Sequence, residues 1–282
     1  MNVAISNTVF ILTTMCKRVI LSSVLSTLLL LILALIPLTI NAEECACDDN
    51  TSGEDATENL TDDSTDKKTS SWQKSAEVGA VSTNGNTKTR TFNGNLNLTN
   101  IRTIWTHTIN IESLVAEENR TSTAEKYRLN LKSDRALTGN GFLFLNLSHE
   151  DDRFSGFDYQ SSIASGYGQT IVDKPQFKLD LEAGPGFRQS LEEASNKRVD
   201  EAILRLAGMA DWQISDTAML EQDVTIESGE DGNITTSKTA LKSSINHSLA
   251  MKLSYTVTHR SVVPEESAKT DSETAMSLVF SF

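Results

Sequence analysis

Long runs in which apolar and polar residues alternate constrain the fold of this chain more than any other feature. The clearest run is FKLDLEAGPGFR (177–188), in which Phe, Leu, Leu, Ala, Pro and Phe share one parity. The charged residues and glycines of the run share the other parity. Strict alternation of this length indicates a β-strand with one apolar and one polar face. Because no window shows a sustained helical period, we predict an all-β fold.

The number and length of these runs indicate a barrel that spans a membrane. Many runs exceed the about five or six residues of a typical soluble strand and reach the about nine to eleven that a tilted strand needs to cross a bilayer. Their number is even, as in single-chain barrels of the bacterial outer membrane. We therefore predict a 12-stranded antiparallel transmembrane β-barrel over residues 72–282. The twelve runs cover approximately residues 72–82, 88–99, 102–115, 123–134, 140–149, 158–170, 175–189, 199–212, 217–227, 235–247, 249–260 and 271–282.

The predicted connections between these runs fall into two sets. Counted from the N-terminus, the odd connections, such as SLEEASNKR, are mostly longer and acidic, whereas the even ones, such as ISD, are shorter. Short periplasmic turns and longer outer loops are typical of outer-membrane barrels. We therefore expect both ends of the barrel domain to lie on the periplasmic side.

The first 42 residues have the order of regions found in a secretory signal peptide. Lys17 and Arg18 precede the apolar run 19–36, and the small residue Ala42 stands before an acidic segment. We predict a signal peptide over residues 1–42. A single membrane anchor is the alternative, because the apolar run is about long enough to span a bilayer.

Residues 43–71 are predicted to form an acidic, disordered linker. They contain ten acids against Lys67 and Lys68, and almost no large apolar side chain. Such a segment cannot bury enough apolar surface to offset the entropy of ordering. Cys45 and Cys47 lie here, too close in sequence for an easy disulfide, and we predict two free thiols.

Composition and motifs argue against several functions. The formal net charge of −13 argues against a nucleic-acid partner, since binding to phosphates requires a basic surface. The chain contains no phosphate-binding loop, dinucleotide-binding glycine pattern or zinc-ligand spacing. We therefore predict neither a cofactor nor a metal site.

Charged residues on the polar face of the predicted strands are the candidate functional residues. Facing the lumen, they would form either the selectivity lining of a polar channel or a salt-bridge network that plugs it. A 12-stranded barrel lies between barrels filled by side chains and barrels with open channels. We therefore predict an envelope protein that forms a narrow channel for small polar solutes, with a closed-lumen structural or salt- and stress-response barrel as the alternative. Bases concentrate on 123–134 and acids on 217–227, nearly opposite in the ring, so an open lumen would carry a transverse field. The candidates are Lys126, Arg128, Lys132, Lys178, Asp180, Glu182, Arg188, Arg205, Glu221, Asp223, Glu227, Lys252 and Arg260.

A lipid-acting enzyme is a further alternative. His259 and Ser261 share a face at the predicted outer end of one strand, with a spacing that a His base and a Ser nucleophile could use. The pair resembles that of outer-membrane phospholipases, in which Asn-Gly should follow the Ser. Here Val262 and Val263 stand in that place. We therefore predict a protein that is not an enzyme.

The segment WQKSAEVGAVSTNGNTKTRTFNGNLNL resembles the opening of the salt-induced outer membrane protein family (domain of unknown function 481). In that family a Trp-led strand runs to a Gly, and a Ser/Thr-x-Gly-Asn-Thr turn leads to a second strand. Trp72, Gly79 and the turn 82–87 match this pattern, and LEAGPGFRQ (181–189) resembles the Gly-rich strand of the family. The resemblance covers about 72–282 and implies an outer membrane of a Gram-negative bacterium as the location, without implying an activity.

The chain ends on SLVFSF, in which Leu278, Phe280 and Phe282 share the apolar parity. This end resembles the C-terminal signal that the barrel assembly machinery reads in outer-membrane barrels. We therefore expect Phe280 and Phe282 to act as an assembly signal. The expected partners are that machinery, outer-membrane lipid and lipopolysaccharide, and the oligomeric state stays open.

Overall fold

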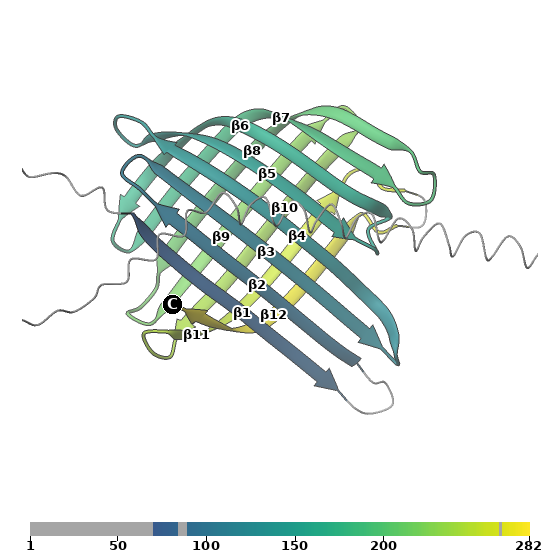
Figure 1. Ribbon diagram of the computed structural model, residues 1–282, viewed down its shortest axis with the longest axis horizontal. Helices are drawn as coiled ribbons and strands as arrows, with labels where there is room; N and C mark the ends of the chain where they lie inside the picture. The colour runs from purple at the N-terminus through teal and green to yellow at the C-terminus, as the bar shows by residue number, and fades with distance from the viewer. Residues whose placement is uncertain (1–69, 84–88, 265–266) are drawn as a thin grey trace, which may run out of the picture. The chain divides into compact units, whose positions relative to one another are not determined.

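The computed structural model describes residues 70–83, 89–264 and 267–282. The predicted signal peptide (1–42) and nearly all of the predicted linker (43–71) lie outside these residues. The described residues form one closed antiparallel barrel (Figure 1). Its strands are β1 Ser71–Thr83, β2 Thr89–Ile101, β3 Trp105–Glu118, β4 Thr121–Ala136, β5 Gly141–Asp152, β6 Phe157–Lys174, β7 Phe177–Glu192, β8 Arg198–Gln213, β9 Ala218–Gly229, β10 Gly232–Ser244, β11 Leu249–Arg260 and β12 Thr270–Ser281.

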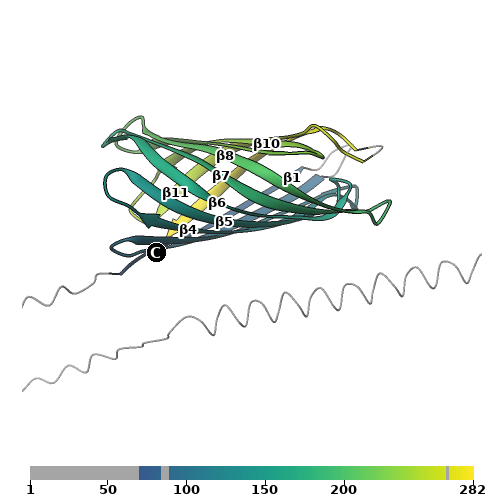
Figure 2. The same cartoon turned by 90° about the horizontal axis from the view of Figure 1, so that it is seen from above.

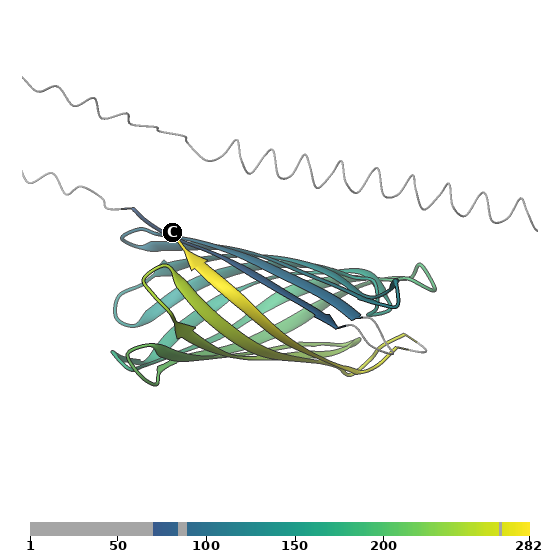
Figure 3. The same cartoon turned by 90° about the horizontal axis from the view of Figure 1, so that it is seen from below.

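This architecture confirms the predicted fold class, and each predicted run overlaps one of the twelve strands. Every strand pairs with its sequence neighbours, and β1 pairs with β12 to close the ring. The closing register joins Ser75 to Ser281 and Val78 to Leu278, so that β12 lies beside β1 in Figure 3. The seam pairs four residues of each strand, so closure covers part of the two edges that an open sheet would expose to the bilayer.

The distribution of apolar and charged side chains in the barrel is the reverse of that in a soluble protein. On β7, Leu181 and Phe187 are 46% and 45% exposed, whereas Glu182 and Arg188, which directly follow them, are only 3% and 4% exposed. Apolar side chains therefore face outward and charged ones face the interior, which is the arrangement of a barrel surrounded by lipid. Among the described residues, no helix is long and apolar enough to cross a bilayer.

The two ends of the barrel differ. We call the end at which β1 begins and β12 ends the base, and the opposite end the mouth; the strands run between them at a tilt (Figure 2). The three tryptophans, Trp72, Trp105 and Trp212, all lie at the base ends of their strands with exposed side chains. Exposed aromatic residues at one level are typical of the belt at a membrane–water interface.

The connections at the mouth differ from the prediction. β3 and β4 are joined by two residues, 119–120, and β9 and β10 by two residues, 230–231, because the strands continue past their predicted ends. Asn119 and Arg120 both have positive φ angles (51° and 69°), as in a tight two-residue hairpin turn. The predicted contrast between long outer loops and short turns is therefore weaker than expected, although residues 261–269 form the longest connection between strands.

Candidate functional site in the barrel lumen

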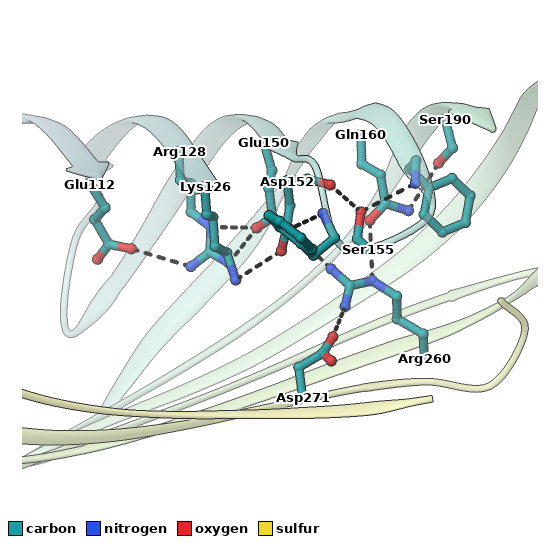
Figure 4. A network of polar contacts seen from close by, with 12 residues as sticks. Glu112, Lys126, Arg128, Glu150, Asp152, Ser155, Gln160, Ser190, Arg260 and Asp271 are labelled. Atoms are coloured by element: carbon teal, nitrogen blue, oxygen red, sulfur yellow. Dashed lines mark hydrogen bonds and ion pairs between the residues drawn. The ribbon is translucent and has the colours of Figure 1, made fainter. Parts of the chain in front are cut away.

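Arg260 joins opposite walls of the barrel at the mouth end of β11. Its guanidinium donates to Glu150 of β5 at 2.9 Å and to Gln160 of β6 at 3.3 Å. β5 and β6 lie on the far side of the ring from β11, and Figure 4 shows Arg260 and Asp271 facing these residues from the other wall. Two side chains from opposite strands meet only where the walls lie close together. The barrel is therefore narrow at this level, and Arg260 is only 3% exposed.

The contacts of Arg260 continue into a chain of ion pairs that crosses the lumen a second time. Glu150 also binds Arg128 of β4, whose Nη1 lies 3.3 Å from Glu112 of β3. Glu112 in turn accepts a hydrogen bond of 2.7 Å from Lys238 of β10, again across the ring. We call Arg260, Glu150, Arg128, Glu112 and Lys238 the cross-lumen network. It links the wall of β10 and β11 to the wall of β3, β4 and β5 at two points.

A second buried cluster surrounds Arg188 of β7. Its guanidinium donates to Glu201 of β8 at 2.6 Å and to the carbonyl oxygen of Gly232 at 2.7 Å. Its Nη1 also lies 3.6 Å from Glu227 of β9. Glu227 accepts a hydrogen bond of 3.0 Å from Ser162 of β6, which is not a neighbour of β9 in the ring. This cluster lies on the mouth half of β7 and β9.

Glu182 of β7 lies between two cations in the interior. Its carboxylate binds Lys132 of β4 and accepts a hydrogen bond of 2.8 Å from Arg205 of β8. The Glu182 side chain has no exposed surface, and β4 is not a neighbour of β7. Burial of a carboxylate requires such pairing, because an isolated charge would lose its hydration without compensation.

The remaining predicted residues form further ion pairs or stand at more open positions. Lys252 lies 3.1 Å from Glu77 and 3.5 Å from Glu221, while Lys126 pairs with Asp152 at 3.6 Å. At the base end of β7, Lys178 pairs with Asp180 at 2.8 Å and is half exposed. Asp223 stands opposite Met209 and Lys238 in the register, and its side chain is exposed.

The cavity beside the cross-lumen network is small. It has a volume of about 50 Å³ and is lined by polar side chains that include Glu112, Arg128, Lys238, Lys252 and Glu273. A cavity needs about 10–15 Å³ of such volume to hold one water. The cavity therefore has room for a few waters.

The geometry of the two residues considered for hydrolysis does not form a catalytic pair. Nδ1 of His259 lies 2.8 Å from the hydroxyl of Thr270. The Ser261 hydroxyl accepts a hydrogen bond of 2.8 Å from the backbone N–H of Asn233. Each side chain is thus engaged with a different strand, and no hydrogen bond joins them among the described residues.

A family model described as "Protein of unknown function, DUF481" matches residues 76–282. The chain belongs to the DUF481 family. This membership confirms the family resemblance of the sequence, while the salt induction in the name of that family stays untested. The DUF481 chain is also 29% identical over 207 residues to "Uncharacterized protein YdiY" of Escherichia coli (strain K12), with 72% of this chain and 81% of that protein covered.

Two solved structures have a barrel similar to that of this DUF481 protein. The NanC porin is 9% identical, with 73% of this chain and 98% of that chain covered and a TM-score of 0.47. The COG4313 outer membrane channel from Pseudomonas putida F1 is 11% identical, with 78% and 99% covered and a TM-score of 0.45. Because both TM-scores are below 0.5, these likenesses support no assignment of function.

The DUF481 lumen combines the predicted residues in a different way from the one the sequence indicated. The bases of β4 pair with carboxylates of β3, β5 and β7, and no ion pair joins them to the acids of β9 among the described residues. The bases of β4 are therefore balanced by carboxylates of strands other than β9. The sequence reasoning missed several inward charges, namely Glu77, Glu112, Asp134, Glu150, Asp152, Glu201, Lys238 and Asp271, although the parity of their strands could have indicated most of them.

Proposed function

We propose that this DUF481 protein is a non-enzymatic barrel of the outer membrane of a Gram-negative bacterium, with a lumen closed to solutes by its cross-lumen network. The main evidence for a closed lumen is the contact of Arg260 with Glu150, because these residues come from opposite walls and are buried. The inward charges neutralise one another at hydrogen-bonding distance, which favours a plug over a water-filled pore.

The outward apolar surface and the belt of tryptophans support a location in a membrane. The predicted signal peptide supports export, and the orientation that follows has the base in the periplasm and the mouth outside. Outer-membrane lipid and lipopolysaccharide would then surround the barrel. A non-enzymatic role agrees with the separate engagement of His259 and Ser261.

A narrow channel for small polar solutes is the second candidate function. The observation that favours it is the exposure of Asp211 and Asp223 on inward-facing positions of β8 and β9. Exposed carboxylates inside the barrel indicate that solvent enters part of the lumen. A channel would require that the cross-lumen network separate at the mouth.

The purified protein tests the two candidates directly. In planar bilayers, we expect no discrete conductance steps from protein that migrates differently on SDS gels with and without boiling, because the network blocks the lumen. Reproducible steps from the unmodified protein would instead favour the channel. Fractionation of the bacterial envelope tests the location, and recovery of the full chain in the soluble fraction would contradict it.

Deletion of Phe282 is expected to reduce assembly more than stability. Its side chain is 70% exposed, and its backbone N–H donates one hydrogen bond of 3.0 Å to Lys74 across the seam. One such bond contributes about 1 kcal/mol, and the remaining register of β1 and β12 stays intact. We expect a several-fold lower yield of folded barrel in the outer membrane, with little change in the urea concentration of unfolding. Equal losses of yield and stability would contradict an assembly signal at Phe280 and Phe282.

A further inference from the structure

An apolar groove lies on the outward face of β6, β7, β8 and β9. Its volume is about 560 Å³. Large side chains form its walls, and two small residues, Ala183 of β7 and Gly208 of β8, form its floor. The register places Tyr167, Ala183, Leu206 and Ile226 in one row across the four strands. All three large residues of this row are exposed, so the groove opens away from the lumen toward the surroundings.

The groove exists because Gly208 has no side chain where its cross-strand neighbours are large. Gly208 stands between Leu181 and Val224 in the register. A Cβ atom added at Gly208 would approach only the Cδ2 atom of Leu181, at 3.3 Å. The space above the glycine is therefore open. A linear apolar group lying in this space would contact the protein on both sides as well as below, which a flat lipid-facing surface does not offer.

A cation lies beyond the base end of this groove. Gln169 and Ile171 line the groove near the end of β6, and Lys174 follows at the last position of that strand. Lys174 stands opposite Phe177, whose parity on β7 is that of the outward Leu181, so its side chain belongs to the outer face. The side chain is exposed and has no ion-pair partner among residues 70–83, 89–264 and 267–282. Trp212, at the base end of nearby β8, marks the level of the interface.

We propose that the groove holds an acyl chain of a glycerophospholipid of the leaflet at the base, with the lipid phosphate at Lys174. The groove supplies apolar walls at the depth of the chains, and Lys174 supplies a positive charge at the depth of the headgroups. This order of an apolar slot followed by a cation matches the order of groups in a phospholipid. The proposal rests on the location in a membrane proposed above and is independent of whether the lumen conducts.

Retained lipid tests the proposal. The full chain is purified from membranes in a mild detergent, and the phospholipid bound per barrel is measured by native mass spectrometry. The double variant Ala183→Leu, Gly208→Leu fills the floor of the groove. We expect it to retain at least about tenfold less phospholipid than the unmodified protein. Binding weakens by about this factor when about two methylenes of the acyl chain are no longer buried against the barrel. The matched control is Ala80→Leu, an exposed outward position on β1, far from the groove in the ring, which should retain the lipid.

A second variant tests the headgroup. Lys174→Ala is expected to keep bound lipid but to lose the preference of the unmodified barrel for a phospholipid over a diacylglycerol, which lacks the phosphate, when the barrel is equilibrated with mixed micelles of the two. Equal retention by the groove-filling variant and the unmodified protein would overturn the chain site, as would an unmodified barrel from membranes that carries no phospholipid. An unchanged headgroup preference of Lys174→Ala would overturn the phosphate site. Absence of the protein from membranes would contradict the proposed location instead. Gel shift on boiling verifies that each variant is folded.

Discussion

Replacement of all five residues of the cross-lumen network by serine is expected to turn a silent barrel into a conducting one. Arg260, Glu150, Arg128, Glu112 and Lys238 connect opposite walls at two points and occupy the lumen with their side chains. Serine is short and polar, so water can enter the space that these side chains leave. We expect discrete conductance steps in planar bilayers from the variant and none from the unmodified protein. Variants that remove only one crossing should give smaller or rarer steps.

The control for this experiment is the double variant Lys178→Ser, Asp180→Ser. It also removes an ion pair from the inner face, but the pair lies within one strand at the base and does not cross the lumen. We expect this control to remain silent. If the five-residue variant folds, as judged by its gel shift on boiling, and is as silent as the control, the network is not what closes the lumen.

Glu182→Ala is expected to cause the largest loss of stability of any single substitution considered for this barrel. The substitution leaves Arg205 in the interior without its ion-pair partner, and it removes one of the two carboxylates beside Lys132. Removal of one partner of a buried ion pair costs about 3–5 kcal/mol, because the remaining charge is left uncompensated. The measurement is the free energy of unfolding in urea, followed by tryptophan fluorescence in detergent or lipid vesicles.

Two further variants serve as controls for this prediction. Glu125→Ala removes the partner of Arg153, a pair in which the Arg153 side chain is 51% exposed, and should cost less than about 1 kcal/mol. The triple variant Lys132→Met, Glu182→Leu, Arg205→Met removes all three buried charges and should recover much of the stability lost in Glu182→Ala. A loss in Glu182→Ala no greater than that in Glu125→Ala would contradict a structural role for this cluster.

The strands were predictable because alternation is a local property of the chain. FKLDLEAGPGFR places Leu181 and Glu182 on opposite faces whatever the rest of the chain does, since successive side chains of a strand point to opposite sides. The prediction was less accurate at strand ends, where Asn119 and Arg120 form a tight turn inside a segment that looked like a loop. The even number of long strands then favoured a closed ring in a membrane over a soluble sheet.

Some inward charges could not be recognised in the sequence, because apolar and polar residues do not alternate clearly along their strand. Lys238 belongs to GNITTSKTALKSS, in which Thr235, Ser237 and Thr239 occupy the outward parity. With hydroxyl groups on the outer face, the contrast between the two faces is weak, and the lumen side of this strand cannot be recognised from its own residues. Its pairing with Asp223 and Thr256 in the register fixes which way Lys238 faces.

The sequence by itself determined that this chain forms a 12-stranded barrel with apolar residues outside and charged residues inside, because both properties follow from a period of two along each strand. Only the tertiary structure decided which charges meet. Arg260 and Glu150 are 110 positions apart, and they touch because the register of the closed ring brings β5 and β11 to the same level and the walls approach each other there. Neither the register nor the width of the lumen is encoded in any single strand. Whether the lumen is lined or blocked therefore depends on the closed ring as a whole.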